Sequence, residues 1–325
     1  MKKTTLILLS IFIIGFSACK KNKVPDGINF KQEMRDFVQG ISTYAKNNNP
    51  DFFIIPQNGN ELSTKDGTET GTPETIYLNA IDGQGQEDLF YGYDSDDRAT
   101  SSDDTNYLKN FLDIEKNAGV QVMVTDYCST HSKMDDAYTK NNANGYISFS
   151  ASERDLNVIP NYPTTPYNVN SNDISTLSDA KNFLYLINPE NFSSKQDFIN
   201  TVSQTDYDII LTDLFFNDTE EYTQTEISEL KTKHKGGKRL LICYMSIGEA
   251  EDYRYYWQSD WNHNKPEWLD KENPNWKGNY KVWYWEKEWQ DIIYGNDNSY
   301  LKKILNAGFD GVYLDIIDAF EYYEQ

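Results

Sequence analysis

The sequence has few of the residues that usually carry metal, redox or nucleophilic chemistry. Its 325 residues include only 3 cysteines and 3 histidines, with no CxxC pair or Cys/His cluster for a structural metal. Cys128 and Cys243 lie in apolar runs, which favours two buried free thiols over a disulfide. His131, His234 and His263 are scattered, so they form neither a serine–histidine pair nor a metal-ligand set of a deacetylase or esterase. We expect no metal and no cofactor.

Positive charge is also scarce. The chain has 30 Lys and Arg against 51 Asp and Glu, which gives a formal net charge of −21. This balance argues against nucleic acid as a partner. Acidity alone can simply keep an exported protein soluble, but it would also suit a cationic or neutral ligand.

An apolar run near the start is too short to cross a bilayer comfortably. Residues 6–16 follow a basic start and precede a small residue and Cys19, a pattern typical of a secretory signal peptide. The stretch also resembles a bacterial lipobox, which implies cleavage before Cys19 and acylation of that residue. We expect a signal peptide at 1–18, a tether at 19–29 and a monomer held on the periplasmic side or cell surface of a bacterial membrane by lipid alone. Plain secretion is the alternative.

Residues 30–325 alternate between helical and strand-like patterns. Amphipathic spacing predicts helices at 30–48, 107–119, 194–204, 225–237 and 299–308. Mostly apolar runs predict strands at 51–59, 75–83, 120–128, 146–152, 182–188, 207–215, 239–248 and 312–317. Eight such strands alternating with helices indicate a parallel sheet covered on both faces and closed into a (β/α)₈ barrel. An open doubly wound sheet is the alternative, although no glycine-rich phosphate turn is present.

Two features concern the order of these units. Residues 153–173 are rich in Asn, Pro, Ser and Thr, which indicates a linker. The first element, at 30–48, is a helix without a preceding strand, and the last, at 312–317, is a strand without a following helix. In a closed barrel these two would be neighbours, as if one strand–helix unit had been cut.

Acidic residues gather where the predicted strands end. They are Asp82, Glu87, Asp126, Asp213, Glu249, Glu251, Asp315 and Asp318. Each alone is more often a loop cap or an ion-pair partner. Because the carboxyl ends of barrel strands share one face, we expect the group to converge there. Tyr244, Gln57 and Asn58 belong to the same strand ends and are further candidates for substrate binding. Converging carboxylates without His or Cys favour glycoside hydrolysis.

All seven tryptophans lie between residues 257 and 289, interspersed with tyrosines. Aromatic side chains stack on the C–H faces of sugars, but they can equally fix a long loop to the barrel. We expect both uses, with Trp257 as the candidate that contacts the substrate.

Several long motifs resemble glycoside hydrolase family 114, the endo-α-1,4-polygalactosaminidase-like barrels. They are "PDFFIIPQNGNEL", "AIDGQGQEDLFY", "SIGEAEDYRYYW", "GNYKVWYW" and "GFDGVYLDIIDAFEYY". The resemblance implies that the family's fifth to eighth units precede its first to fourth here, so that the chain is a circular permutant whose old ends are joined through 153–173. Barrel termini lie close together, which makes such a rearrangement tolerable.

The resemblance also implies roles for two of the acids. Asp315 matches the fourth-strand aspartate, the implied nucleophile or stabiliser. Glu87 matches the sixth-strand glutamate, the implied acid/base, with Asp88 and Asp82 as competitors. We would then expect Glu87 to have a raised pKa and Asp315 to stay ionised. The expected substrate is a galactosamine-containing or other amino-sugar polysaccharide, cleaved within the chain. The rival reading is a non-catalytic barrel that binds glycan at the cell surface.

Overall fold

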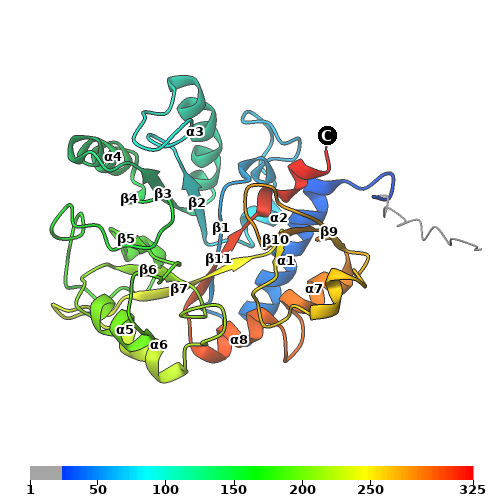
Figure 1. The fold of residues 1–325 in the computed structure, drawn as a ribbon. Coiled ribbons are helices and arrows are strands. Elements are labelled where there is room, and N and C mark those ends of the chain that lie inside the picture. The colour runs from blue at the N-terminus through cyan, green and yellow to red at the C-terminus, as the bar shows by residue number, and fades with distance from the viewer. Residues whose placement is uncertain (1–23, 325) are drawn as a thin grey trace, which may run out of the picture.

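A computed structural model describes residues 24–324 of the chain, which form an α/β fold with parallel strands surrounded by helices (Figure 1). The expected signal peptide and Cys19 lie outside these residues. Within 24–324, no helix combines the length and the apolar character needed to cross a membrane.

Eight parallel strands make up the centre of the molecule. They are β1 (Phe53–Pro56), β2 (Gly83–Glu87), β3 (Gln121–Tyr127), β4 (Ile147–Ala151), β5 (Phe183–Tyr185), β6 (Ile209–Thr212), β7 (Leu240–Ser246) and β11 (Gly311–Asp315). The helices are α1 (Phe30–Asn48), α2 (Thr75–Leu78), α3 (Ser102–Asn117), α4 (His131–Asn144), α5 (Lys195–Ser203), α6 (Gln224–Leu230), α7 (Lys287–Ile293) and α8 (Tyr300–Ala307). Short 3₁₀ turns are η1 (Asn60–Ser63), η2 (Leu177–Asp179), η3 (Ser259–Asn262) and η4 (Ile317–Tyr322).

The parallel strands form two sheets whose edges touch. One sheet has the order β1-β11-β7-β6-β5 and the other β2-β3-β4. A parallel bridge between Gln57 and Gly85 joins β1 to β2, and another between Ser148 and Asn182 joins β4 to β5. Each of the eight strands therefore has a neighbour on both sides, and the carboxyl ends of all eight point the same way.

Helix α1 begins and ends as its sequence predicts and packs against the elements that flank the last strand. The Asn29 side chain caps its start by accepting from the Gln32 N–H. Its buried face includes Phe37 and Ile41. The helix contacts η4 and α8, which flank β11 along the chain. In Figure 1 the blue start of α1 lies next to the red end of the chain, where Lys31 pairs with Glu324.

The strand predicted at 75–83 is wrong. Residues 75–78 instead form α2, whose Tyr77 and Leu78 are buried and whose N-cap, Glu74, accepts from the Ile76 N–H. The strand follows as "GQGQE", which has no apolar residue for a pattern to detect. Its glutamines are buried all the same, because they bond to other polar groups. The Gln84 side chain donates to Asn60 Oδ1 at 2.9 Å, and the Gln86 side chain accepts from the Asn60 amide.

The aromatic stretch after β7 is a structured layer rather than a loop. It contains an antiparallel sheet with the order β8-β10-β9, formed by Glu249–Glu251, Asn279–Val282 and Leu269–Glu272, followed by α7. The tryptophans pack on one another there, for example Trp261 on Trp268 with ring centroids 5.1 Å apart. This layer lies beyond the carboxyl end of β7 and forms one wall of the cleft described next.

Residues 153–173 connect β4 to β5 without regular secondary structure. The segment is fixed at both ends. Arg154 bonds to Asp88 near its start, and the Asn170 side chain donates to Asp208 at 2.8 Å near its end. Asp208 is fully buried and also pairs with the equally buried Lys233, so this contact ties the connection to β6.

Candidate active site

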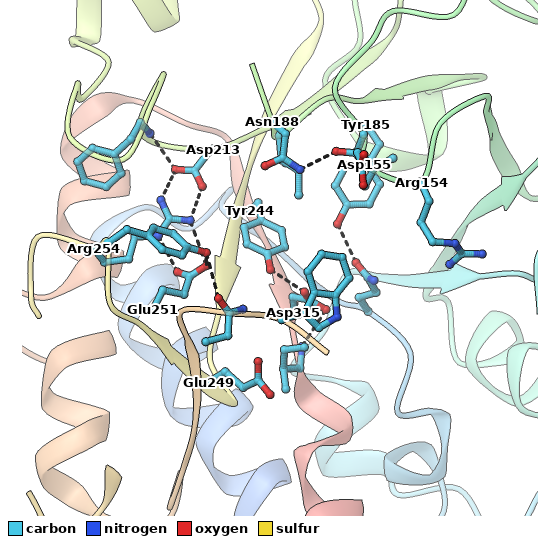
Figure 2. Close-up of a pocket in the computed structure, with 18 of the residues that line it drawn as sticks. Arg154, Asp155, Tyr185, Asn188, Asp213, Tyr244, Glu249, Glu251, Arg254 and Asp315 are labelled. Atoms are coloured by element: carbon cyan, nitrogen blue, oxygen red, sulfur yellow. Dashed lines mark hydrogen bonds and ion pairs between the residues drawn. The ribbon is translucent and has the colours of Figure 1, made fainter. Parts of the chain in front are cut away.

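A cleft of about 600 Å³ opens at the carboxyl ends of the parallel strands. Of the residues predicted to meet there, nine line it: Gln57, Asn58, Glu87, Asp213, Tyr244, Glu249, Glu251, Asp315 and Asp318. They come from both sheets and from the aromatic layer. Figure 2 shows Tyr244 and Asp315 in the middle of the cleft, with Arg254 on one side and Arg154 on the other.

Glu87 is the last residue of β2, and three side chains donate hydrogen bonds to its carboxylate. Gln57 and Asn58, which follow β1, donate their amides to Oε2, the latter at 3.0 Å. The Tyr127 hydroxyl, at the end of β3, donates to Oε1. Asn58 also accepts from the Glu87 backbone N–H at 3.1 Å. The carboxylate is therefore held in one position by the ends of the two flanking strands, β1 and β3.

Asp315 ends β11 and shares the cleft with Glu87. Its Oδ2 accepts from the Tyr244 hydroxyl at 2.6 Å and its Oδ1 from the Ile316 N–H at 2.8 Å. Burial, and after it the negative charge of Glu87, raise the pKa of Asp315 to about 7. The rise in pKa from burial and charge outweighs the lowering by the two donated hydrogen bonds. The expectation that Asp315 is the firmly ionised member of the pair is therefore not met in the unliganded protein.

Two further carboxyls extend this acidic group. Burial and the charge of Asp315 raise the pKa of Asp318, in η4, to about 8. Glu249 is fully buried, and its pKa is raised by burial although the Asn273 amide and the Tyr322 hydroxyl donate to its Oε1. Its Oε2 accepts no hydrogen bond of normal geometry from a described residue. Burial and mutual repulsion therefore favour a bound proton in this acidic group.

Asp213 and Glu251 are also in the cleft, but a buried arginine neutralises part of their charge. The Arg254 guanidinium donates to both oxygens of Asp213, at 2.9 and 2.6 Å, and to Glu251 at 2.6 Å. The Tyr253 hydroxyl donates to Glu251 as well. This ion-pair network links the end of β6 to β8, so it fixes the aromatic layer to the strands.

The backbone is strained where three of the strands end. Asn58, Asp88 and Ile316 have φ values of 59°, 60° and 59°. This left-handed conformation is most unfavourable for a β-branched residue such as Ile316. Each of the three lies directly beside a cleft residue: Asn58 beside Gln57, Asp88 beside Glu87, and Ile316 beside Asp315. Such strain concentrates where side-chain placement matters more than stability.

Three predicted site residues lie elsewhere. Asp82 precedes β2 instead of following it, because the strand was misplaced, and it pairs with Lys46 and accepts from the Ile54 N–H at the opposite end of the strands. Asp126 is buried and accepts from Phe90 N–H, Tyr91 N–H and the Asn141 amide, one residue short of the inward-facing Tyr127. Successive strand residues face opposite ways, which explains the difference.

Trp257 is the third misplaced candidate. It packs on Trp261 and Tyr280, with ring centroids 5.1 and 4.9 Å apart, and does not line the cleft. Trp276 does line the cleft, and 57% of its surface is exposed. It lies in the turn between β9 and β10, where its N–H bonds to the Asn273 carbonyl. Of the tryptophans in the described residues, Trp276 lines the cleft, whereas the candidate Trp257 packs against other rings.

Sequence reasoning missed the cleft residues Tyr127, Arg154, Tyr185 and Arg254. Tyr185, on β5, donates to Gln57 Oε1 at 2.9 Å, so it orients the amide that faces Glu87. Arg254 follows the two glutamates within the quoted motif "SIGEAEDYRYYW", and the excess of acids there was a signal for a buried cation. Arg154 lies in the linker, where no pattern pointed to a site.

Comparison with known proteins finds a family model that matches the second part of the chain. Residues 164–325 match the model of glycoside-hydrolase family GH114. The match covers β5 to β11, including Tyr244, Arg254 and Asp315, and supports glycoside hydrolase activity in general.

Curated relatives come from distant microorganisms, and each is described only as an uncharacterised protein. One from Methanocaldococcus jannaschii is 42% identical over 158 residues, which is 48% of this chain and 42% of the relative. One from Thermotoga maritima is 41% identical over 38% of this chain and 36% of the relative. One from Deinococcus radiodurans is 37% identical over 40% and 39%. The chain thus spans about two-fifths of the length of the relatives it matches.

Proposed function

We propose that this protein is a glycoside hydrolase that cleaves within an amino-sugar polysaccharide, with Glu87 and Asp315 as its two catalytic carboxyls. The observation that carries the proposal is their placement. Both end parallel strands of one ring, both line the same cleft, and the charge of Glu87 contributes to the raised pKa of Asp315. Two carboxyls that share a proton across a cleft are what acid-assisted glycosidic cleavage requires.

The fold that we infer is a single (β/α)₈ barrel whose units are circularly permuted. The two bridges at Gln57 and Ser148 support closure of the ring, since they link the free edges of both sheets. The position of α1 supports the permutation. It contacts η4, which follows the last strand β11, and η1, which follows the first strand β1, and these two strands pair in parallel. A family match that covers β5 to β11 but not β1 to β4 fits a chain in which the order of the units differs.

In the proposed reaction, Glu87 gives its proton to the glycosidic oxygen as the bond to the anomeric carbon breaks. Asp315, ionised, attacks or stabilises that carbon, and water then completes the hydrolysis and returns a proton to Glu87. At the moment of reaction the proton of the pair must therefore lie on Glu87 and not on Asp315. Since the negative charge of Glu87 contributes to the raised pKa of Asp315, about 7, loss of that proton leaves both carboxyls ionised and none to donate, so we expect kcat/KM to fall as the pH rises through that value.

The charge of the cleft supports a cationic sugar. Eight carboxyls and three basic side chains line it, and two of the three, Arg154 and Arg254, are already paired with acids. An ammonium group on the sugar would be attracted to the remaining negative charge, and beside Asp315 it would favour the ionised form of that carboxyl. A partly deacetylated galactosamine polymer has this character.

We also propose, from the sequence alone, that Cys19 carries lipid and that the protein is a monomer on the outer side of a bacterial membrane. The substitution Cys19→Ala should then move the protein from the membrane fraction to the soluble fraction. Sedimentation of the variant with membranes would contradict the lipid anchor.

The direct test is incubation of the purified protein with α-1,4-linked galactosamine and glucosamine polymers of defined acetylation, followed by sizing of the products. We expect a rapid shift to intermediate lengths, because an enzyme that cleaves within the chain shortens it before small sugars accumulate. Cleavage of the fully acetylated polymer alone would contradict the cationic substrate. Tight binding without any cleavage would favour the glycan-binding barrel.

A further inference from the structure

The linker between the two halves of the strand ring supplies one wall of the cleft. Its first residues, Arg154, Asp155 and Leu156, all line the cavity. Of these three, Arg154 contacts the side chains next to Glu87, the proposed catalytic acid. In Figure 2 its side chain lies across the cleft from Arg254.

Arg154 touches two side chains that adjoin Glu87. Its guanidinium carbon lies 3.8 Å from the centre of the Tyr127 ring, a close cation–π contact. Tyr127 is buried, and its hydroxyl donates to Glu87. The guanidinium therefore covers the ring that holds one oxygen of the catalytic carboxylate. It also bonds to Asp88, the residue directly after Glu87, with Nη2 to Oδ1 at 2.8 Å and Nη1 to Oδ2 at 3.4 Å.

The backbone around the Arg154–Asp88 ion pair leaves space for the two side chains. Asp88 has a φ of 60°, a conformation that needs an outside contact to hold it. Gly92 has a φ of 120° and faces the pair, and a Cβ there would lie 1.9 Å from Asp88 Oδ1 and 3.0 Å from Arg154 Nη2. The Gly92 carbonyl accepts from Arg154 at 3.1 Å. A second acid, Asp96, accepts from the guanidinium Nε at 2.6 Å.

The charges around Asp88 show what Arg154 offsets. Burial raises the pKa of Asp88 to about 6, and the charges of Glu87 and Asp126 also raise it, while Arg154 lowers it through its hydrogen bond and charge. Without the guanidinium, Asp88 would lie uncompensated beside the catalytic glutamate.

We propose that Arg154 is a positioning residue for Glu87, which it holds through its stacking on Tyr127 and its ion pair with Asp88. The inference rests on the proposed function for its kinetic consequences but not for its geometry. It assigns a role in the reaction to the segment that joins the two halves. It also predicts that a lysine cannot replace Arg154, since an ammonium group offers neither a flat face for the ring nor a fork for the carboxylate.

The test compares Arg154→Met, Arg154→Lys and the control Arg98→Gln. Arg98 lies in the same loop region and pairs with Asp94 at the surface, where 66% of its side chain is exposed. We expect Arg154→Met to lower kcat at least tenfold, with KM changed less than twofold, and to shift the pH dependence of kcat. Arg154→Lys should recover less than half of the lost kcat, and the control should match the wild type. A second variant, Gly92→Ala, should reproduce the kcat loss by displacing the pair.

A readout independent of turnover separates this inference from the proposed function. In ¹³C-carboxyl NMR, with Asp88→Asn to assign the signal, the pKa of Asp88 should rise above about 6 in Arg154→Met and stay unchanged in Arg98→Gln. If the wild type hydrolyses no polymer but the Asp88 pKa rises, the proposed function fails and the ion-pair part of the inference stands. An active Arg154→Met protein with wild-type kcat and pH dependence would overturn the positioning role. A loss of kcat matched by an equal loss of folded protein would overturn it too.

Discussion

Each half of the strand ring places one of the two proposed catalytic carboxyls in the cleft, but the two halves hold them differently. In residues 24–152, Glu87 is held by side chains, namely the amides of Gln57 and Asn58 and the hydroxyl of Tyr127. In residues 174–324, Asp315 is held by one hydroxyl and by the N–H of Ile316, whose backbone is strained. The first arrangement depends on three side chains, whereas the second depends on one side chain and on the path of the backbone.

The two halves also differ in their arginines. Arg154, near the boundary, is 36% exposed and contacts the side chains around Glu87. Arg254, in the second half, is 6% exposed and lies between Asp213 and Glu251. A buried ion pair that loses one partner leaves an uncompensated charge, whereas a half-exposed arginine can be lost at little cost to folding. We therefore expect the first arginine to affect activity and the second to affect stability.

The largest effect should come from the carboxyls themselves. Asp315→Asn and Glu87→Gln each remove a charge with little change in volume, and we expect each to lower kcat by roughly 10²- to 10⁴-fold. Polymer affinity and melting temperature should stay near those of the wild type. The readouts are reducing-end release, equilibrium binding and thermal unfolding of the same preparations. Undiminished hydrolysis by either variant would exclude that residue from the mechanism.

Next in size is the loss of the buried cation. Arg254→Met leaves Asp213 and Glu251 unpaired, and we expect a loss of about 3–5 kcal/mol in the free energy of unfolding. The control is Lys287→Met, which removes a surface ion pair with Asp291 from a side chain that is 82% exposed. Urea denaturation of both variants measures the difference. Equal stabilities would mean that the network does not tie the aromatic layer to the strands.

A smaller effect is expected for the exposed tryptophan of the second half. Trp276→Ala should raise KM roughly tenfold, which corresponds to about 1.4 kcal/mol of binding energy, because a flat surface for the sugar is lost. Its melting temperature should change little, since 57% of the side chain is exposed. Trp257→Ala should show the opposite pattern, with lower stability and an unchanged KM. If both variants changed KM and melting temperature in the same way, a position in the cleft would not distinguish a sugar-binding tryptophan from a packing one.

An effect of similar size, on stability instead of binding, concerns a buried acid in the first half. Glu115 of α3 is fully buried, and burial raises its pKa well above the usual value. Neither of its oxygens accepts a hydrogen bond of normal geometry from a described residue. The folded state favours the protonated form of Glu115. The contribution of this residue to the free energy of unfolding is therefore present below pH 4 and is lost as the pH rises toward the raised pKa.

Glu115→Gln removes this dependence. Relative to the wild type, the variant should gain roughly 1–3 kcal/mol in free energy of unfolding between pH 4 and pH 8. Asp113→Asn, an exposed change on the same helix, is the control and should follow the wild type. Parallel stability curves for Glu115→Gln and the wild type would contradict a strongly raised pKa.

How much the sequence could reveal also differs between the halves. Strands such as "IILT" and "LLICYMS" are buried on both faces and are plain as apolar runs. Strand β2 could not be found in this way, because Gln84 and Gln86 are buried through hydrogen bonds that only the assembled ring provides. Glu87 was still placed in the cleft, whereas Asp82 was assigned to the wrong end of the strand. Alternate residues of β3 face opposite ways, so Asp126 points away from the cleft while Tyr127 lines it. The composition of the aromatic stretch likewise does not indicate which tryptophan stays exposed.

The central claim is that Glu87 and Asp315 act as one catalytic unit although they come from different halves. The most direct measurement is kcat for the two single variants and for the double variant Glu87→Gln/Asp315→Asn. Residues that act together are strongly non-additive, because the loss of one already abolishes the step that needs both. The account predicts that the double variant is no slower than the slower single variant, within about threefold. A double variant whose loss equals the product of the two single losses would contradict the claim.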